Sequence, residues 1–211
     1  MKKYSLLVFD WDGTLVDSKG LLIESLQKTA VYFNYPIPEI TTIRKHFGLT
    51  IEEMLKNLFP KEDQPELIAK FHNYFSKENI AINLFPGAIE ILNYLKQSGF
   101  ILAIATNATR IKLDASLDMA RIKNLFAATC CPEDAAPKPA PEMLLTLIEK
   151  LAFMPQDTLM IGDTTVDMQF ANNAEVDALA VCYGNHRKDQ LAAFNPIDFI
   201  GDIRELKNIL Q

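Results

Sequence analysis

Cysteine is scarce in this 211-residue sequence, which contains only Cys130, Cys131 and Cys182. Three cysteines cannot pair evenly, and two of them are sequence neighbours, so a disulfide framework is not expected. The sequence also has no CxxC motif and no cluster of cysteine and histidine, which argues against a zinc site. We therefore expect a reduced chain in the cytoplasm.

Glycine is also sparse, and its spacing excludes several common motifs. No two of the eight glycines are separated by a single residue, so the sequence has no GxGxxG fingerprint. It has neither a phosphate-binding P-loop nor a GxSxG nucleophile elbow. The three histidines are never four residues apart, which excludes HExxH. Dinucleotide-binding, serine-hydrolase and zinc-protease interpretations therefore fail.

Positive charge and long apolar runs are the other deficits. Lysine and arginine total 21 against 27 aspartates and glutamates, a net charge of −6, which argues against nucleic acid or anionic membrane as partners. The first apolar run, Tyr4 to Phe9, ends at Asp10 and is shorter than the core of a secretion signal. No apolar run approaches the ~20 residues of a membrane span. Hydrophobic residues still make up 49% of the chain, a globular composition.

Short apolar runs alternate with helix-period segments along most of the chain. The expected strands are Ser5–Phe9, Phe100–Ala105, Ala127–Cys130, Thr158–Ile161, Ala178–Val181 and Ile197–Ile200. The expected helices are Ala88–Gln97, Arg110–Ala120, Pro141–Leu151, Val166–Asn173, Lys188–Ala193 and Ile203–Leu210. Apolar strands separated by helices predict an α/β fold, a Rossmann-like doubly wound parallel sheet covered on both faces.

Residues 17–85 are the exception, because they contain helix-period apolar positions and no convincing strand. Leu22, Leu26, Ala30 and Phe33 mark one such helix. The segment Phe85-Pro86-Gly87 is a natural return to the main fold. We therefore predict a core domain of residues 1–16 and 86–211 and an inserted all-helical domain of residues 17–85.

Polar side chains follow three of the predicted strands at the point where each strand ends. They are Asp10 and Asp12 after the first strand, Thr106 and Asn107 after the second, and Asp163 with Asp167 after the fourth. The carboxyl ends of parallel strands meet at one edge of the sheet, where ligands bind. A single aspartate after a strand is often only a turn or helix cap. Two such clusters of hard oxygen ligands predict a magnesium site instead.

These residues resemble the signatures of the haloacid dehalogenase superfamily of aspartate-nucleophile phosphatases. The run Asp10-Trp11-Asp12-Gly13-Thr14-Leu15-Val16-Asp17-Ser18 is similar to the first signature. Thr106 with Asn107, Lys138 between two prolines, and Gly162-Asp163 with Asp167 follow in the expected order. The chain is most similar to the phosphoglycolate phosphatase-like group, whose members carry an inserted helical cap. Glu175 stands where glycine is more usual.

The resemblance implies that Asp10 is the nucleophile and forms an aspartyl-phosphate. It implies that Mg²⁺ is held by Asp10, by the backbone carbonyl of Asp12 and by Asp163. The side chain of Asp12 would protonate the leaving alcohol and later activate the hydrolytic water.

The resemblance also implies that three groups bind the phosphoryl oxygens: Thr106, the backbone of Asn107, and Lys138. Lys138 would contact the nucleophile as well. Asp167 would support either the water shell of the metal or Lys138.

Several functions remain open on this pattern. The favoured one is a magnesium-dependent phosphatase, a phosphoric monoester hydrolase acting on a small phosphorylated metabolite such as a phosphoglycolate-like compound or a sugar phosphate. A phosphomutase, an inorganic pyrophosphatase or a non-catalytic binding protein would share the fold. The cap would select the substrate, and its basic run Arg44-Lys45-His46 is either a substrate contact or a solvated helix face. A monomer and a homodimer are equally compatible with the sequence.

Overall fold

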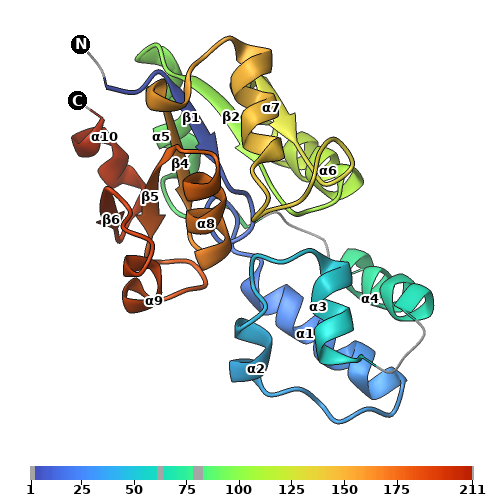
Figure 1. The fold of residues 1–211 in the computed structure, drawn as a ribbon. Helices are drawn as coiled ribbons and strands as arrows, with labels where there is room; N and C mark the ends of the chain where they lie inside the picture. Colours follow the sequence, from blue (N-terminus) through green and yellow to red (C-terminus); the bar gives the residue numbers. More distant parts are fainter. Residues whose placement is uncertain (1–2, 61–63, 78–82, 211) are drawn as a thin grey trace.

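The structure is a computed structural model, which describes residues 3–60, 64–77 and 83–210. Its centre is a parallel sheet with the strand order β3-β2-β1-β4-β5-β6 over the described residues (Figure 1). The strands are β1 (Leu6–Phe9), β2 (Ile101–Ala105), β3 (Ala128–Cys130), β4 (Thr158–Gly162), β5 (Asp177–Val181) and β6 (Asp198–Ile200). The predicted α/β fold and all six predicted strands are confirmed, and each strand differs from its predicted range by one residue at one end.

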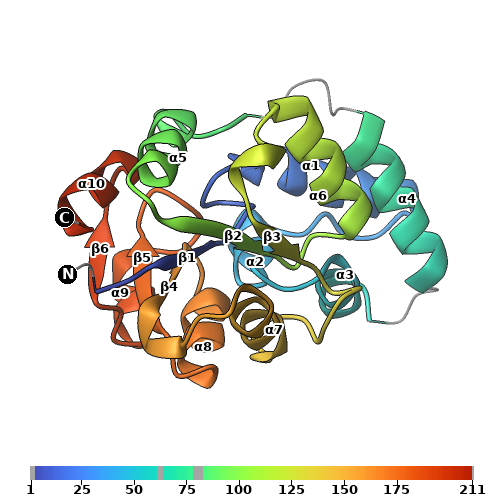
Figure 2. The ribbon, with the colours of Figure 1, turned by 90° about the horizontal axis from the view of Figure 1, so that it is seen from above.

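Helices cover both faces of the sheet, as Figure 2 shows from above. One face carries α5 (Ala88–Gln97), α6 (Arg110–Ala120) and α10 (Leu206–Ile209), and the other carries α7 (Glu142–Leu151), α8 (Thr165–Asn173) and α9 (Lys188–Ala192). Strand β1 explains why both faces need cover. Leu7 and Phe9 belong to one apolar cluster while Leu6 and Val8 belong to the other, because successive side chains point to opposite faces.

A separate group of helices lies next to the sheet layer in Figure 1. Its members are α1 (Lys19–Tyr32), α2 (Ile40–Arg44), α3 (Ile51–Leu58) and α4 (Gln64–Lys77). They enclose a third apolar cluster centred on the buried side chains of Leu26, Met54 and Phe71. Helix α3 begins with a capping box, in which Thr50 and Glu53 satisfy each other's backbone amides. We call residues 17–85 the cap; its status as a separate domain stays a prediction.

The chain enters and leaves the cap at one place. Val16 and Leu84 form an antiparallel bridge. On either side of it, the amide of Asp17 donates to the carbonyl of Asn83 at 2.8 Å, and the amide of Phe85 donates to the carbonyl of Leu15 at 2.9 Å. These contacts fix the two linkers beside each other, at the carboxyl end of β1.

Helix α8 ends in an unusual backbone conformation. Glu175, two residues beyond the last helical residue, has a φ of 56°. This left-handed conformation favours glycine, because a Cβ atom crowds the backbone there. The glutamate is exposed and lies outside the site described below.

Among the described residues, none of the helices combines the length and apolar character that crossing a membrane requires.

Candidate active site

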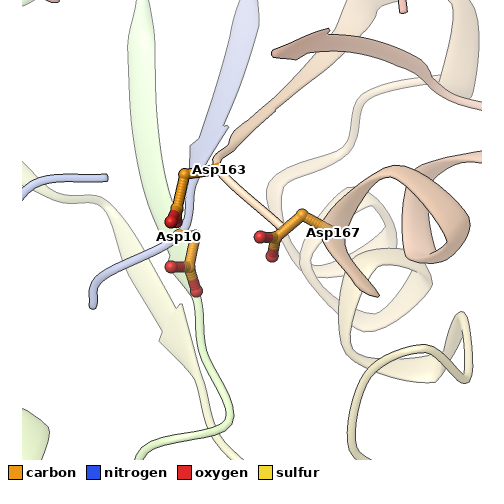
Figure 3. Close-up of side chains that lie close together, drawn as sticks. All are labelled: Asp10, Asp163 and Asp167. Carbon is orange, nitrogen blue, oxygen red and sulfur yellow. The ribbon is translucent and has the colours of Figure 1, made fainter. Parts of the chain in front are cut away.

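Three buried carboxylates meet at the carboxyl edge of the sheet. Asp10 follows β1, Asp163 follows β4, and Asp167 lies in the first turn of α8. Figure 3 shows the three side chains close together, and each offers an oxygen within 4.8 Å of the others. Their exposed fractions are 7%, 0% and 2%. Strand pairing brings them together, because β1 and β4 are neighbours and end at the same level.

Lys138 links two of these carboxylates. Its Nζ donates to Asp10 Oδ1 at 2.8 Å and to Asp167 Oδ1 at 2.7 Å, and the side chain is 1% exposed. Burial on its own lowers the pKa of Lys138, but the two adjacent carboxylates outweigh it and raise that pKa above its ordinary value. The lysine is therefore a buried cation that is bonded to the predicted nucleophile.

Asp163 is fixed by two donors from other segments. Thr14 Oγ1 donates to Asp163 Oδ1 at 3.0 Å, and the backbone amide of Asn185 donates to Oδ2 at 2.7 Å. Burial raises the pKa of Asp163 well above its ordinary value, and the charges of Asp10 and Asp167 add to the effect. Gly184 lets the chain approach this closely, since a Cβ there would lie 2.3 Å from Asp163 Oδ2.

Asp167 has two tasks in the structure. Its Oδ2 accepts from the amide of Thr164 at 3.0 Å and from Thr164 Oγ1 at 2.6 Å. The amide of Asp167 in turn donates to Thr164 Oγ1 at 3.2 Å, which completes the capping box of α8. Its Oδ1 accepts from Lys138. Both oxygens of Asp167 therefore have partners. Asp167 therefore contacts Lys138, which is one of the two alternatives that the resemblance left open. A role beside the water shell of a metal stays a prediction.

The donor set fits a divalent cation. Three buried carboxylates face a single buried ammonium group, so the site carries two uncompensated negative charges when all are ionised. Burial raises the pKa of Asp10 to about 7, against the opposing effect of Lys138 and with a further contribution from Asp167. Hard oxygen ligands and an excess negative charge of this size suit Mg²⁺. Asp10, Asp163 and Asp167 each offer an oxygen that could hold such an ion. A role for the Asp12 carbonyl stays a prediction.

The two polar residues after β2 have separate partners. Thr106 is buried, and its Oγ1 accepts from the amide of Ala108 at 3.1 Å. Asn107 exchanges hydrogen bonds with the backbone of Lys138, accepting at 2.9 Å and donating at 3.0 Å. Its amide also donates to the carbonyl of Gly48 in the cap at 2.8 Å. The sequence located Asn107 but gave no sign of this contact to the cap.

Asp12 lies beside this cluster and pairs with a residue that the sequence analysis missed. Lys112 Nζ, in the first turn of α6, lies 2.6 Å from Asp12 Oδ2. The same Nζ lies 4.6 Å from the centre of the Phe75 ring in the cap. Asp12 Oδ1 is buried and has no hydrogen-bond partner within the described residues. The position of Lys112, just after β2, could have marked it, because that turn starts at the same sheet edge.

A cavity of about 710 Å³, including its opening to solvent, lies between this edge of the sheet and the cap. The core supplies polar groups to it, among them Asp10, Asp12, Thr106 and Lys112. The cap supplies mainly apolar side chains. The basic run Arg44-Lys45-His46 does not line it, and Arg44 and Lys45 are exposed, so the solvated-face interpretation holds in this structure.

Comparison with known proteins shows the family of this chain. The family model of haloacid dehalogenase-like hydrolases matches residues 7–181. The chain belongs to this family. The matched segment includes every predicted site residue, from Asp10 to Asp167. It also includes the whole cap.

Individual relatives of this haloacid dehalogenase-like hydrolase match over most of their length. "Probable phosphatase IndB" of Dickeya dadantii is 31% identical over 90% of this chain and 86% of its own. A phosphoglycolate phosphatase of Agrobacterium fabrum is 31% identical over 85% of this chain and 81% of its own. The solved structure of a haloacid dehalogenase-like hydrolase from Bacteroides fragilis has a TM-score of 0.86 and 28% identity, covering 97% of this chain and all of that one.

Proposed function

We propose that the protein is a magnesium-dependent phosphatase that hydrolyses a small phosphorylated organic molecule through an aspartyl-phosphate. The observation that carries the proposal is the hydrogen bond from buried Lys138 to Asp10, which lines the cavity and lies next to Asp163. An ammonium group bonded to a nucleophilic carboxylate also attracts a phosphoryl group to it. The names of the two relatives, both phosphatases, support the same reaction class.

Asp10 would perform the covalent step. One of its carboxylate oxygens forms a bond to phosphorus while the bond from phosphorus to the substrate oxygen breaks, and the alcohol leaves. Water then attacks the phosphorus of the aspartyl-phosphate, which releases inorganic phosphate and restores the Asp10 carboxylate. Mg²⁺, when held by Asp10, Asp163 and the Asp12 carbonyl, would supply positive charge that reduces repulsion between the two anions.

Asp12 would move the proton in both steps. It gives a proton to the leaving alcohol oxygen and later takes one from the attacking water. Asp12 lines the same cavity as Asp10, and its Oδ2 is held in place by Lys112. An alcohol is a poor leaving group without a proton, so this residue favours an alkyl phosphate as the substrate.

Three groups would hold the phosphoryl oxygens during transfer: Thr106, the backbone amide of Asn107, and Lys138. Thr106 and Asn107 both line the cavity next to Asp10. Asp167 would act through Lys138, since its Oδ1 fixes the Nζ of that lysine at 2.7 Å. Donors fixed in advance of the reaction stabilise the developing charge without having to reorganise.

Hydrolysis of 4-nitrophenyl phosphate with and without Mg²⁺, beside the Asp10→Asn variant, tests the proposal. We expect phosphate release that needs the metal and falls by at least about 10³-fold in the variant, because an amide is a poor nucleophile. Full activity of Asp10→Asn would overturn the assignment. Incubation with a phosphosugar detects a phosphomutase, which isomerises the sugar without net phosphate release. Incubation with inorganic pyrophosphate detects a pyrophosphatase.

A further inference from the structure

The wall of the cavity opposite Asp10 is apolar. The cap lines it with Leu22, Leu49, Ile51, Met54, Phe71 and Phe75. Leu22, Leu49 and Ile51 are only half-buried, so part of each side chain faces the cavity. Pockets that bind organic molecules have this composition, in which apolar walls surround a few polar groups that orient the ligand. The core supplies most of the polar groups, among them the predicted nucleophile Asp10, and the cap adds Ser18, Lys19 and His72.

The cations in the cavity already have partners. Lys112 Nζ forms an ion pair with Asp12 and also lies over the Phe75 ring. Lys19 Nζ, from the first turn of α1, donates to the carbonyl of Gly184 at 2.7 Å. Burial lowers the pKa of His72, which favours its neutral form at pH 7. A second anionic group on the substrate would have to compete with these contacts, whereas an apolar group would meet surface that is ready to be buried.

Resting on the proposed function, we infer that the substrate is a phosphomonoester of an alcohol with an apolar body, alkyl or aromatic, and that the cap wall around Leu49 selects it. Such an alcohol extends from the phosphoryl group at Asp10 across the cavity to the cap. Burial of the apolar body removes water from both surfaces and thereby favours binding. A short acid phosphate such as 2-phosphoglycolate leaves this wall exposed to water.

A series of alkyl phosphates tests the inference on the intact protein with Mg²⁺. Benzyl phosphate and hexyl phosphate are compared with 2-phosphoglycolate and glycerol 3-phosphate, whose alcohols have comparable acidity, so leaving-group chemistry does not decide the order. We expect kcat/KM at least about tenfold higher for the two apolar substrates, the range that apolar pocket contacts provide. Equal or higher kcat/KM for 2-phosphoglycolate overturns the inference and leaves the proposed function intact.

Leu49 offers a direct test of the wall. It lines the cavity but does not belong to the apolar cluster at the centre of the cap, so we expect its replacement to leave the fold of the cap unchanged. In Leu49→Asn we expect kcat/KM for benzyl phosphate to fall about fivefold or more, with less than about a twofold change for glycerol 3-phosphate. Leu49→Met retains the apolar wall and should keep the preference for benzyl phosphate.

Ile37→Asn is the matched control, because Ile37 is an apolar cap residue that is 57% exposed and does not line the cavity. This variant should leave kcat/KM for all four substrates unchanged. If Leu49→Asn lowers kcat/KM for all substrates equally, the wall does not select the substrate and the inference fails. If neither the wild type nor Leu49→Met releases phosphate from 4-nitrophenyl phosphate, the proposed function itself has failed.

Discussion

The side-chain amide of Asn107 bridges two parts of the molecule, donating to the carbonyl of Gly48 in the cap and to the carbonyl of Lys138 in the core. Gly48 itself lies against Thr164, whose hydroxyl donates to Asp167. One loop of the cap therefore contacts both Asn107, which binds the backbone of Lys138, and Thr164, which binds Asp167. We therefore expect the placement of the cap against the core and the position of Lys138 to depend on each other.

The Gly48→Ala substitution should weaken the contact between this loop of the cap and the core. Gly48 has a φ of 91°, and a Cβ there would lie 2.7 Å from Thr164 Oγ1 and 3.1 Å from Thr164 Cβ. We expect a strain of about 1–2 kcal/mol in this conformation, relieved when the loop withdraws from the core. Amide hydrogen exchange around Gly48 should accelerate, and KM should rise several-fold.

Gly20→Ala provides the control for this change. Gly20 lies in α1, and a Cβ there would meet nothing within 4 Å. Alanine is the better helix former, so the free energy of unfolding should rise by about 0.5–1 kcal/mol, and Tm should rise with it. Activity should stay unchanged. Wild-type exchange and KM in Gly48→Ala would show that the loop tolerates a side chain and that the coupling is absent.

Lys112→Met should lower activity, because the ion pair to Asp12 is lost while most of the apolar stem is retained. We expect kcat/KM to fall about tenfold, which corresponds to about 1.4 kcal/mol. Lys207→Met is the matched control, since Lys207 Nζ lies 2.7 Å from Glu90 on the surface of the core. Exposed pairs of this kind contribute little to stability. Equal activity in the two variants would remove Lys112 from the site.

Magnesium should stabilise the protein more at pH 8 than at pH 6. Burial raises the pKa of Asp10 from 3.8 to about 7, so between these values the folded state binds more protons than the unfolded state. The free energy of unfolding of the metal-free protein therefore falls as the pH rises through this range. A divalent cation offsets this loss of stability, because it binds the ionised carboxylates of the folded state.

Thermal unfolding with and without Mg²⁺ at the two pH values measures this effect. The increase in Tm on adding the metal should be larger at pH 8, and Asp10→Asn should reduce the difference between the two pH values. An equal increase at both pH values contradicts the expectation. Unfolding in the presence of excess chelator gives the metal-free baseline.

Glu175→Gly should stabilise the protein by about 1 kcal/mol, because glycine adopts the left-handed conformation at the end of α8 without strain. Glu149→Gly, at an exposed position within α7, should destabilise it by about 1 kcal/mol. Chemical denaturation of the two variants beside the wild type gives both values. Changes of the same sign would show that the local conformation at Glu175 does not govern the result.

Most of the fold could be predicted because the strands are buried on both faces. Leu6 to Phe9 are all apolar, and each pairs with β2 and β4, so the run itself identifies a central strand. The strand ends then located Asp10, Thr106 and Asp163 at one edge. Lys138 lies in a loop, and only the ordered signatures of the family pointed to it.

Other parts of the site could not be predicted, and the reason differs for each residue. The backbone amide of Asn185 holds Asp163, and almost any residue supplies a backbone amide, so the residue type carries no signal. The pairing of Lys112 with Asp12 depends on where α6 lies after β2. The contact of Asn107 with Gly48 depends on the placement of the cap, which helix periodicity does not encode.

The paired linkers at Val16 and Leu84 have a consequence for the exchange of parts between proteins. Because the chain crosses to the cap and back through adjacent, hydrogen-bonded backbone, a foreign helical segment needs only two neighbouring ends to replace the part of the cap between Asp17 and Asn83. The junction uses backbone amides and carbonyls, so it places few demands on the sequence of the insert. A transplanted segment would bring its own cavity wall to an unchanged set of carboxylates, and recombination at this point offers a route from one substrate to another.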